Sequence, residues 1–453
     1  MRKKEKQDLS NFIDLLEQAH AQIVACVFRD EKNNVNQLLI DCQEGAISIG
    51  TMVEESEGEG NNFVHILEQY CESLYMIGQE VDSTADKAFL RKKSTQYDKM
   101  FQKYVENLRV SLNNDVRTTK EIVFLPYNSS MWDSLESVYL KSLEEPDCES
   151  FVIPIPYFER DKDGKLGKMH YEGDKFPDNI KITNYEEYDF QNRHPDKIYI
   201  HNPYDASNYV TSVHPFFYSK NLKQYTDDLV YIPYFVLREI EPNDYASIAG
   251  MEHFIKVPAV IHANTVIVQS ENMRQIYIDV MTKETGEESR PYWEEKIKGY
   301  GSPKFDKVRR IREEGIKLPE EWEKKLYRND GTRKKVIFYN TSVVALLNYK
   351  ETMIDKIESV IKQFEEMKDN VLLIWRPHPL MLSTIDTMRP ELGDRYRKIV
   401  ENYKKCEWGV YDEMPSMDYV LSICDAYYGD GSSVVWLCQN QKIPVMIQNP
   451  CIK

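Results

Sequence analysis

The sequence predicts an α/β protein in which two doubly wound, parallel-sheet domains follow an N-terminal helical module. Apolar residues recur at helical spacing up to about residue 112, whereas short continuous apolar runs alternate with helical stretches from Glu121 onward. A charged segment containing glycine and proline divides the alternating part in two. We expect a helical module over residues 1–115, a first α/β domain over 120–330 and a second over 331–453.

The first 115 residues show only helical periodicity. Apolar residues between Leu9 and Val24 recur at three- and four-residue steps, which marks one face of a helix. The acidic, glycine-containing stretch 54–62 predicts an exposed loop, and a second stripe begins at Phe63. A third helix is predicted over 85–112. Three helices without a strand indicate packing or self-association rather than chemistry.

The first α/β domain is predicted from a change of pattern at Glu121, where EIVFLPY reads as a strand covered on both faces. Further apolar runs predict a single doubly wound sheet with strands at 122–125, 151–155, 197–200, 229–232 and 266–269. Helices are predicted at 131–143 and 273–281.

The second α/β domain is predicted after the charged connection 282–335. Its strands are expected at 336–339, 371–375, 425–428 and 445–447, and its helices at 352–368 and 396–405. Two such domains face to face form a cleft between their strand ends, where open α/β sheets bind ligands.

Composition excludes several classes of function. With 58 Lys+Arg against 74 Asp+Glu the net charge is −16, which disfavours a basic nucleic-acid-binding face. No apolar run of about 18 residues and no signal peptide is evident, so we expect a cytoplasmic protein. The eight cysteines are scattered without a Cys-x-x-Cys pair or zinc-ligand spacing, which predicts reduced thiols and no metal site.

One candidate site is the sequence WRPHP at 375–379, directly after a predicted strand. Arg376 and His378 would lie at the carboxyl end of that strand, and both can donate hydrogen bonds to phosphate oxygens. The two prolines stiffen the loop. The alternative is a proline-rich strand exit with a solvated arginine and histidine.

A second candidate is DAYYGDGSSVVW at 425–436, a strand followed by a tight turn and a helix. Gly429 and Gly431 allow the turn, Ser432 can cap the helix, and the N–H groups at the helix start form an anion site. The alternative is an ordinary strand–helix turn with a serine cap.

His201 and His214 are weaker candidates in an aromatic-rich stretch of the first α/β domain. Each could project from a strand end as a base of suitable pKa. A histidine in such surroundings is more often a core residue, so both interpretations stay open.

Five segments stand in an order that resembles one known family. They are SVHP at 212–215, ANTVIVQSENMR at 263–274, GSPKFD at 301–306, RPHP at 376–379 and DAYYGDGSS at 425–433. This order resembles the CDP-glycerol glycerophosphotransferase family of wall teichoic acid synthesis, the teichoic acid polymerase-like proteins, which have the two-domain GT-B fold. The resemblance covers about residues 120–450 and not the N-terminal helices. The RPHP segment with the later turn and helix is its most specific part.

The resemblance implies a reaction in which a hydroxyl of a cell-surface polymer, or of its lipid-linked precursor, attacks the β-phosphorus of CDP-glycerol and CMP leaves. It implies a nucleotide donor, a polymer or lipid-linked acceptor, peripheral contact with the inner face of the membrane and no metal or other cofactor. The N-terminal domain would be the acceptor side and the C-terminal domain the nucleotide donor side. Outside the region of the resemblance, we expect the N-terminal helices to allow a homo-oligomer.

The resemblance also implies the roles of particular residues. His214 would be the general base, and His378 would act with Arg376 on the donor's pyrophosphate. The donor-binding residues would be Arg376, Asp430, Ser432, Ser433, Ser270 and Gly301.

Three departures from the family pattern leave other functions open. His214 is followed by Pro215 instead of glycine, Gly431 stands where the family has tyrosine, and the arginine expected after Tyr339 is absent. One alternative is a glycosyltransferase that uses a nucleotide sugar or CDP-ribitol. Another is a non-catalytic, nucleotide-binding protein of the same fold.

Overall fold

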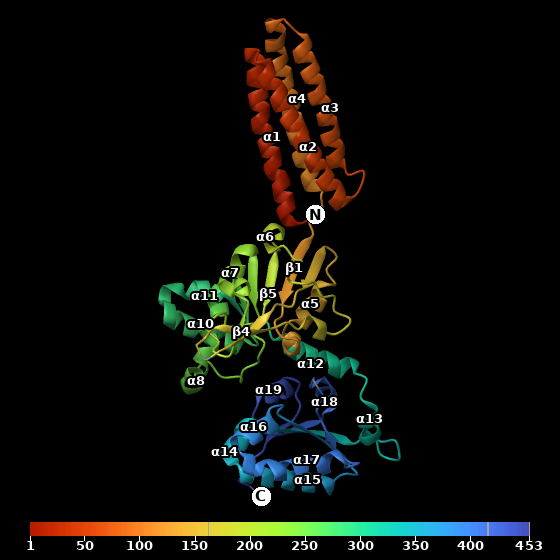
Figure 1. The fold of residues 1–453 in the computed structure, drawn as a ribbon, viewed down its shortest axis with the longest axis vertical. Helices are drawn as coiled ribbons and strands as arrows, with labels where there is room; N and C mark the ends of the chain where they lie inside the picture. Colours follow the sequence, from red (N-terminus) through yellow and green to blue (C-terminus); the bar gives the residue numbers. More distant parts are fainter. Residues whose placement is uncertain (162, 415, 453) are drawn as a thin grey trace.

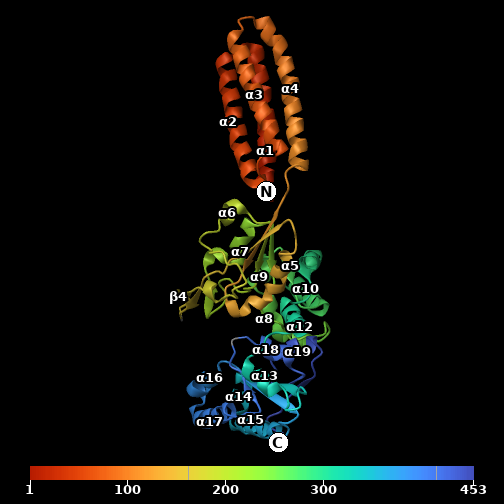
Figure 2. The same cartoon turned by 90° about the vertical axis from the view of Figure 1, so that its right-hand side faces the viewer.

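The computed structural model describes residues 1–161, 163–414 and 416–452. Figures 1 and 2 show three parts in a row, with a helical module at one end, one α/β unit in the middle and a second α/β unit at the other end. The predicted fold class, α/β with parallel sheets and an N-terminal helical module, is confirmed. In the described ranges, no helix combines the length and apolarity that a membrane span needs.

The N-terminal module contains four long helices in the described chain, so the prediction of three was wrong. They are α1 (Lys3–Arg29), α2 (Lys32–Glu57), α3 (Asn62–Ser83) and α4 (Lys87–Asn114). The sequence pattern missed α2 because its buried face includes small side chains, at Cys42, Ala46 and Gly50, which give a weak apolar stripe. The predicted loop at 54–62 is shorter, because α2 continues to Glu57.

A buried histidine lies in the core of this module. His20 Nε2 is 2.6 Å from the hydroxyl of Tyr70, and the His20 ring stacks on Phe101 with 4.1 Å between ring centroids. The Nδ1 atom of His20 is buried and has no hydrogen-bond partner. Because the charged imidazolium would lose its hydration there, burial lowers the pKa of His20 to about 4.

This histidine predicts a loss of stability in acid. In the unfolded chain His20 has its ordinary pKa of 6.5, so below that pH the unfolded state binds a proton that the folded state does not. The free energy of unfolding should therefore fall as the pH drops from 6.5 to about 4, by about 3 kcal/mol in total. Denaturant titrations of the wild type and of His20→Gln, which keeps a polar group near Tyr70 but does not titrate, should diverge over this range. Parallel pH profiles for the two proteins would contradict the prediction.

The middle unit is built on a six-stranded parallel sheet with the strand order β2-β1-β5-β7-β8-β9. Alternate side chains of β1 enter different cores, with Val123 and Leu125 on one face and Ile122 and Phe124 on the other, so helices and loops cover both faces. The five predicted strands are present, and β9 was not predicted. The bounds are β1 (Lys120–Leu125), β2 (Cys148–Val152), β5 (Lys197–Ile200), β7 (Asp228–Tyr231), β8 (Thr265–Ile267) and β9 (Ile297–Lys298).

The helices of the middle unit are mostly short. The helix predicted at 131–143 is divided into the 3-10 helix η1 (Ser129–Ser134) and α5 (Glu136–Ser142), and the one at 273–281 lies inside α10 (Glu271–Thr285). The others are α6 (Phe190–Arg193), α7 (Ser219–Leu222), α8 (Tyr245–Ile255), α9 (Pro258–His262) and α11 (Arg290–Lys296).

The same unit carries a small antiparallel sheet that the sequence did not predict. Its strands are β3 (Tyr157–Arg160), β4 (Leu166–His170) and β6 (Thr211–Val213), in the order β4-β3-β6. β4 is mostly exposed, so it shows no apolar run.

The second α/β unit has a five-stranded parallel sheet in the order β12-β11-β10-β13-β14. Phe338 and Ile374 face one core, and Tyr339 and Trp375 face the other. The strands are β10 (Lys335–Thr341), β11 (Val371–Pro377), β12 (Val410–Tyr411), β13 (Ala426–Gly429) and β14 (Val445–Ile447). The helices are α14 (Val343–Tyr349), α15 (Glu351–Glu365), α16 (Met381–Met388), α17 (Gly393–Lys404), α18 (Asp418–Ile423) and α19 (Ser433–Asn440).

The helix α12 (Pro303–Glu314) joins the two α/β units. Its apolar residue Phe305 belongs to the core of the second sheet, as does Trp322 of the following helix α13 (Glu320–Leu326). Lys307 of α12 lies 3.4 Å from Glu136 of the middle unit and 3.0 Å from Asp418 of the second unit. The division predicted at residue 330 stays a prediction. Residues of both α12 and α13, which precede it, pack on the sheet that follows it.

Candidate functional site

The strand order of the second sheet identifies one edge as the candidate ligand site. From β10 the chain moves to β11 and β12 on one side and then returns to β13 on the other side. The crevice at a doubly wound sheet's topological switch point therefore lies at the carboxyl ends of β10 and β13. Two helices begin there, α14 after Ser342 and α19 after Ser432. Backbone N–H groups at helix starts favour anions.

Asn340, near the end of β10, links the loops around this crevice. Its side-chain Nδ2 donates to the backbone oxygen of Arg376 at 2.8 Å. Its Oδ1 accepts hydrogen bonds from the hydroxyls of Tyr427 at 3.3 Å and Ser432 at 3.4 Å. One buried amide thus holds the exits of β11 and β13 in register. Sequence reasoning missed Asn340, although a polar residue at the end of the apolar run VIFY was a visible signal.

The turn after β13 depends on Gly429, which has φ +152°. A Cβ atom at this position would lie 2.1 Å from the backbone oxygen of Asn340, so only glycine fits. Asp430 follows and is buried, with its carboxylate accepting hydrogen bonds from Ser342 N and from Gln448 Nε2, both at 2.5 Å. Burial raises the pKa of Asp430. Through these contacts Asp430, in the loop after β13, is hydrogen-bonded to the loops that follow β10 and β14.

Arg376 is likewise held inside the protein. Its Nη1 lies 2.8 Å from Oδ2 of Asp412, and the Asp412 side chain has no exposed surface. Asp412 Oδ1 also accepts a hydrogen bond from Met414 N at 2.9 Å. The guanidinium of Arg376 therefore compensates the negative charge of the buried Asp412 carboxylate.

Replacing Arg376 with methionine should destabilise the fold by about 3 kcal/mol, because Asp412 would keep its charge in a buried place without a partner. Adding Asp412→Asn removes that charge and keeps the bond to Met414, so the double variant should recover part of the loss. Denaturant titration of the three proteins measures both effects. A single variant as stable as the wild type would show that the ion pair contributes nothing.

His378 and Ser433 are the exposed polar groups of this edge. His378 Nδ1 accepts a hydrogen bond from Leu380 N at 3.2 Å, so the neutral ring carries its proton on Nε2 and can donate it. Partial burial lowers the pKa of His378. The predicted cap by the Ser432 side chain is absent: Ser432 occupies the N-cap position but makes no side-chain bond to α19.

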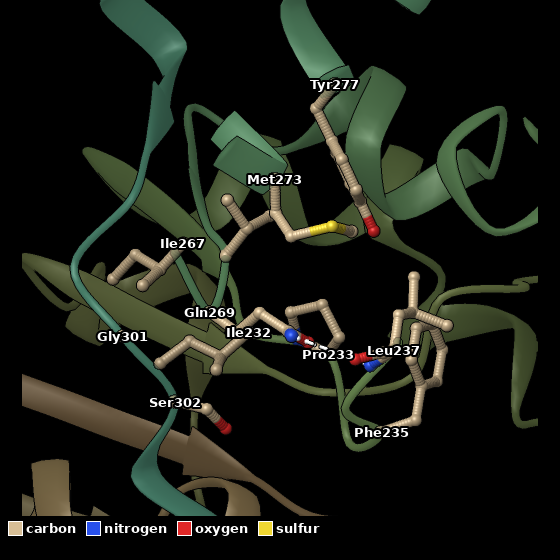
Figure 3. Close-up of a pocket in the computed structure, with 11 residues that line it drawn as sticks. Ile232, Pro233, Phe235, Leu237, Ile267, Gln269, Met273, Tyr277, Gly301 and Ser302 are labelled. Atoms are coloured by element: carbon tan, nitrogen blue, oxygen red, sulfur yellow. Dashed lines mark hydrogen bonds between the residues drawn. The ribbon is translucent and has the colours of Figure 1, made fainter. Parts of the chain in front are cut away.

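Ser270 follows β8 and Gly301 follows β9, so both lie on the middle unit and on a different sheet from Arg376. The Ser270 hydroxyl caps α10 by accepting from Met273 N at 3.1 Å and donates to Glu239 at 2.5 Å. Gly301 has φ +106° and lines the cavity drawn in Figure 3, between β7, β8 and α10. That cavity has a volume of only about 10 Å³, which is room for about one water molecule.

The structure distinguishes the two candidate histidines, His201 and His214. His201 is fully buried, accepts a hydrogen bond from Tyr127 N at 3.1 Å and lies 2.9 Å from Ser134 Oγ. Burial lowers its pKa to about 3, so His201 is a core residue.

His214 is exposed and follows β6 of the small sheet. Its Nδ1 accepts from Phe216 N at 3.3 Å, and a base acting through Nε2 needs the tautomer that gives up this bond.

Side chains that could hold a metal ion are not clustered: the described residues contain no group of three or more His, Cys, Asp or Glu at suitable positions. The groups at the crevice are instead hydrogen-bond donors, namely His378 Nε2 and the amides at the start of α19. Such groups suit a negatively charged ligand.

Two doubly wound parallel sheets in one chain, with polar side chains gathered at the strand ends, define an α/β protein with two parallel-sheet units. Among solved structures, UDP-GlcNAc 2-epimerase from Neisseria meningitidis bound to UDP-GlcNAc is 9% identical, with 72% of this chain and 82% of that chain covered and a TM-score of 0.42. UDP-GlcNAc 2-epimerase from Methanocaldococcus jannaschii is 13% identical, with 73% of this chain and 83% of that chain covered and a TM-score of 0.42. The trehalose 6-phosphate synthase from Burkholderia multivorans is 11% identical, with 73% of this chain and 83% of that chain covered and a TM-score of 0.36. No protein-family model and no curated protein matches the chain.

Proposed function

We propose that the protein is a transferase that moves glycerol phosphate from CDP-glycerol to a hydroxyl of a cell-surface polymer or its lipid-linked precursor. The observation that carries the proposal is the convergence of two helix starts at the β10/β13 switch point, with His378 at the neighbouring strand exit. The order of the sequence segments favours CDP-glycerol among nucleotide donors.

In this proposal the second sheet holds the donor's pyrophosphate. Transfer spreads negative charge over the phosphate oxygens, so catalysis consists mainly of positioning and of placing donors where charge develops. His378 would donate from Nε2, and the amides at Ser432 and Ser433 would bind a second oxygen. Arg376 and Asp430 would act as positioning residues, because their own charged groups are held by Asp412 and by Ser342 and Gln448.

The first sheet and its small antiparallel sheet would receive the acceptor. His214 would take the proton of the attacking hydroxyl. Ser270 and Gly301, which the resemblance assigns to donor binding, would contribute from the loops after β8 and β9. The β-phosphorus gains the acceptor oxygen and loses the oxygen that links it to CMP. The proton passes to His214, and CMP leaves.

A second candidate, nucleotide binding without turnover, is favoured by one observation. Arg376 is the cation of the RPHP segment, and its ion pair with Asp412 occupies part of its donor capacity. In that case the backbone N–H groups at the starts of α14 and α19 would bind the nucleotide's phosphates without Arg376.

Release of CMP or UDP tests both candidates. The full chain is incubated with CDP-glycerol, CDP-ribitol or a UDP-sugar, together with a hydroxyl acceptor, and the freed nucleotide is measured. Release of CMP from CDP-glycerol, dependent on the acceptor, is the expected result. Release from UDP-sugars only would assign a glycosyltransferase, and tight nucleotide binding without release would assign the non-catalytic function.

A further inference from the structure

A second cavity, away from the switch point, lies on the middle unit between the small antiparallel sheet and residues 185–191. Its volume is about 660 Å³, within the range of small-molecule sites. Six of the side chains that line it are aromatic rings from the segments around α6, η3 (Pro215–Phe217) and η4 (Lys223–Tyr225): Tyr185, Tyr188, Phe190, Phe216, Phe217 and Tyr225.

These rings support one another, so the cavity is formed before any ligand enters. Phe216 lies 5.0 Å from Phe217 and 5.6 Å from Phe190, measured between ring centroids, and both pairs are edge to face. Phe216 also stacks on Tyr225 at 5.3 Å. A rigid aromatic wall loses little conformational entropy on binding.

The charged groups at the cavity are carboxylates. Glu186 is exposed at its edge, where its Oε1 accepts a hydrogen bond from the Tyr185 hydroxyl at 3.1 Å. Asp189 accepts from Asn192 N at 3.0 Å and from Asn192 Nδ2 at 2.6 Å, which lowers the pKa of Asp189. Of the described residues that line the cavity, none is lysine or arginine. A phosphate would meet two negative charges here.

We propose that this cavity binds an organic cation, a small molecule whose positively charged nitrogen carries apolar substituents. The faces of aromatic rings attract such a cation, and the two carboxylates add to that attraction. The apolar substituents fill the cavity without losing hydrogen bonds to water. The cavity is separate from the donor crevice but includes His214, the base of the proposed function, in its lining. The inference does not depend on transfer of glycerol phosphate, because the rings and carboxylates that favour a cation are present in either case.

Calorimetric titration of the full chain with two matched probes tests the charge requirement. Choline is an organic cation, and 3,3-dimethylbutan-1-ol has nearly the same shape with carbon in place of the charged nitrogen. We expect choline to bind about tenfold more tightly, since a desolvated cation–π contact is worth about that factor. Equal binding of both probes, or no binding of choline at millimolar concentration, would overturn the proposal.

Two variants locate the bound cation. Glu186→Gln keeps the side chain's shape and should weaken choline binding about twofold to fivefold, whereas Glu187→Gln, a neighbouring exposed residue outside the cavity lining, should leave it unchanged. Tyr225→Leu keeps apolar volume but removes a ring and should weaken choline about fivefold while changing the alcohol little. Circular dichroism confirms folding of each variant. Choline affinity that is unchanged in both Glu186→Gln and Tyr225→Leu would place the cation elsewhere and overturn the assignment.

Discussion

Replacing Gly429 with alanine is expected to lower the free energy of unfolding by about 4 kcal/mol or more, among the largest effects a single substitution produces. The added Cβ would lie 2.1 Å from the oxygen and 2.8 Å from the nitrogen of Asn340, and both are backbone atoms that cannot rotate away. The strands cannot separate easily, because Gly429 is paired with Asn340 on one side and its oxygen accepts from Gln448 N on the other. Denaturant titration measures the loss.

Gly431→Ala is the matched control, two residues further along the same turn. A Cβ atom added at Gly431 would meet no described atom within 4 Å, and the φ of Gly431 is not positive. Its substitution should therefore change stability by less than about 0.5 kcal/mol. Similar losses in the two variants would mean that the turn, and not the close approach to Asn340, determines the cost.

Replacing His214 with alanine is expected to lower turnover of the proposed transfer by a factor of roughly 10² to 10⁴ and to leave nucleotide affinity nearly unchanged. The reason is that a general base acts on the acceptor's hydroxyl and does not contact the nucleotide. His214 is exposed, so the variant should fold, and thermal unfolding of both proteins checks this. Steady-state release of CMP and nucleotide binding are the two readouts.

His214→Gln separates a base from a hydrogen-bond donor. Glutamine can donate a hydrogen bond from a position near Nε2 but cannot accept a proton near neutral pH. If His214 is the base, glutamine will not rescue activity. Full activity of the alanine variant would contradict a catalytic role and would favour nucleotide binding without turnover.

The central strands of the parallel sheets were predictable because their residues are buried on both faces. The runs at 122–125 and 371–375 lie inside β1 and β11, since a strand covered on both sides shows a continuous apolar run without polar alternation. The helix α2 and the small sheet were not predictable by the same signal. The buried face of α2 includes small side chains, and the strand β4 is mostly exposed.

Much of the candidate site was predictable from one rule, that the residues following parallel strands gather at one edge. That rule placed Arg376, His378 and Ser433 at the end of the second sheet. It could not show that Arg376 is paired with Asp412, because the pair joins residues 36 positions apart through tertiary packing. Nor could it find the aromatic cavity, whose rings come from segments separated along the chain.

The side-chain amide of Asn340 restricts which substitutions the loops after β11 and β13 can accept. Because a single side chain contacts Arg376, Tyr427 and Ser432, the loops after β11 and β13 are energetically coupled, and substitutions in them will not contribute independently. A loop transplanted from another protein at either position would have to bring a partner for that amide. Variation in ligand preference should therefore arise more readily in the exposed ends of these loops than at their bases.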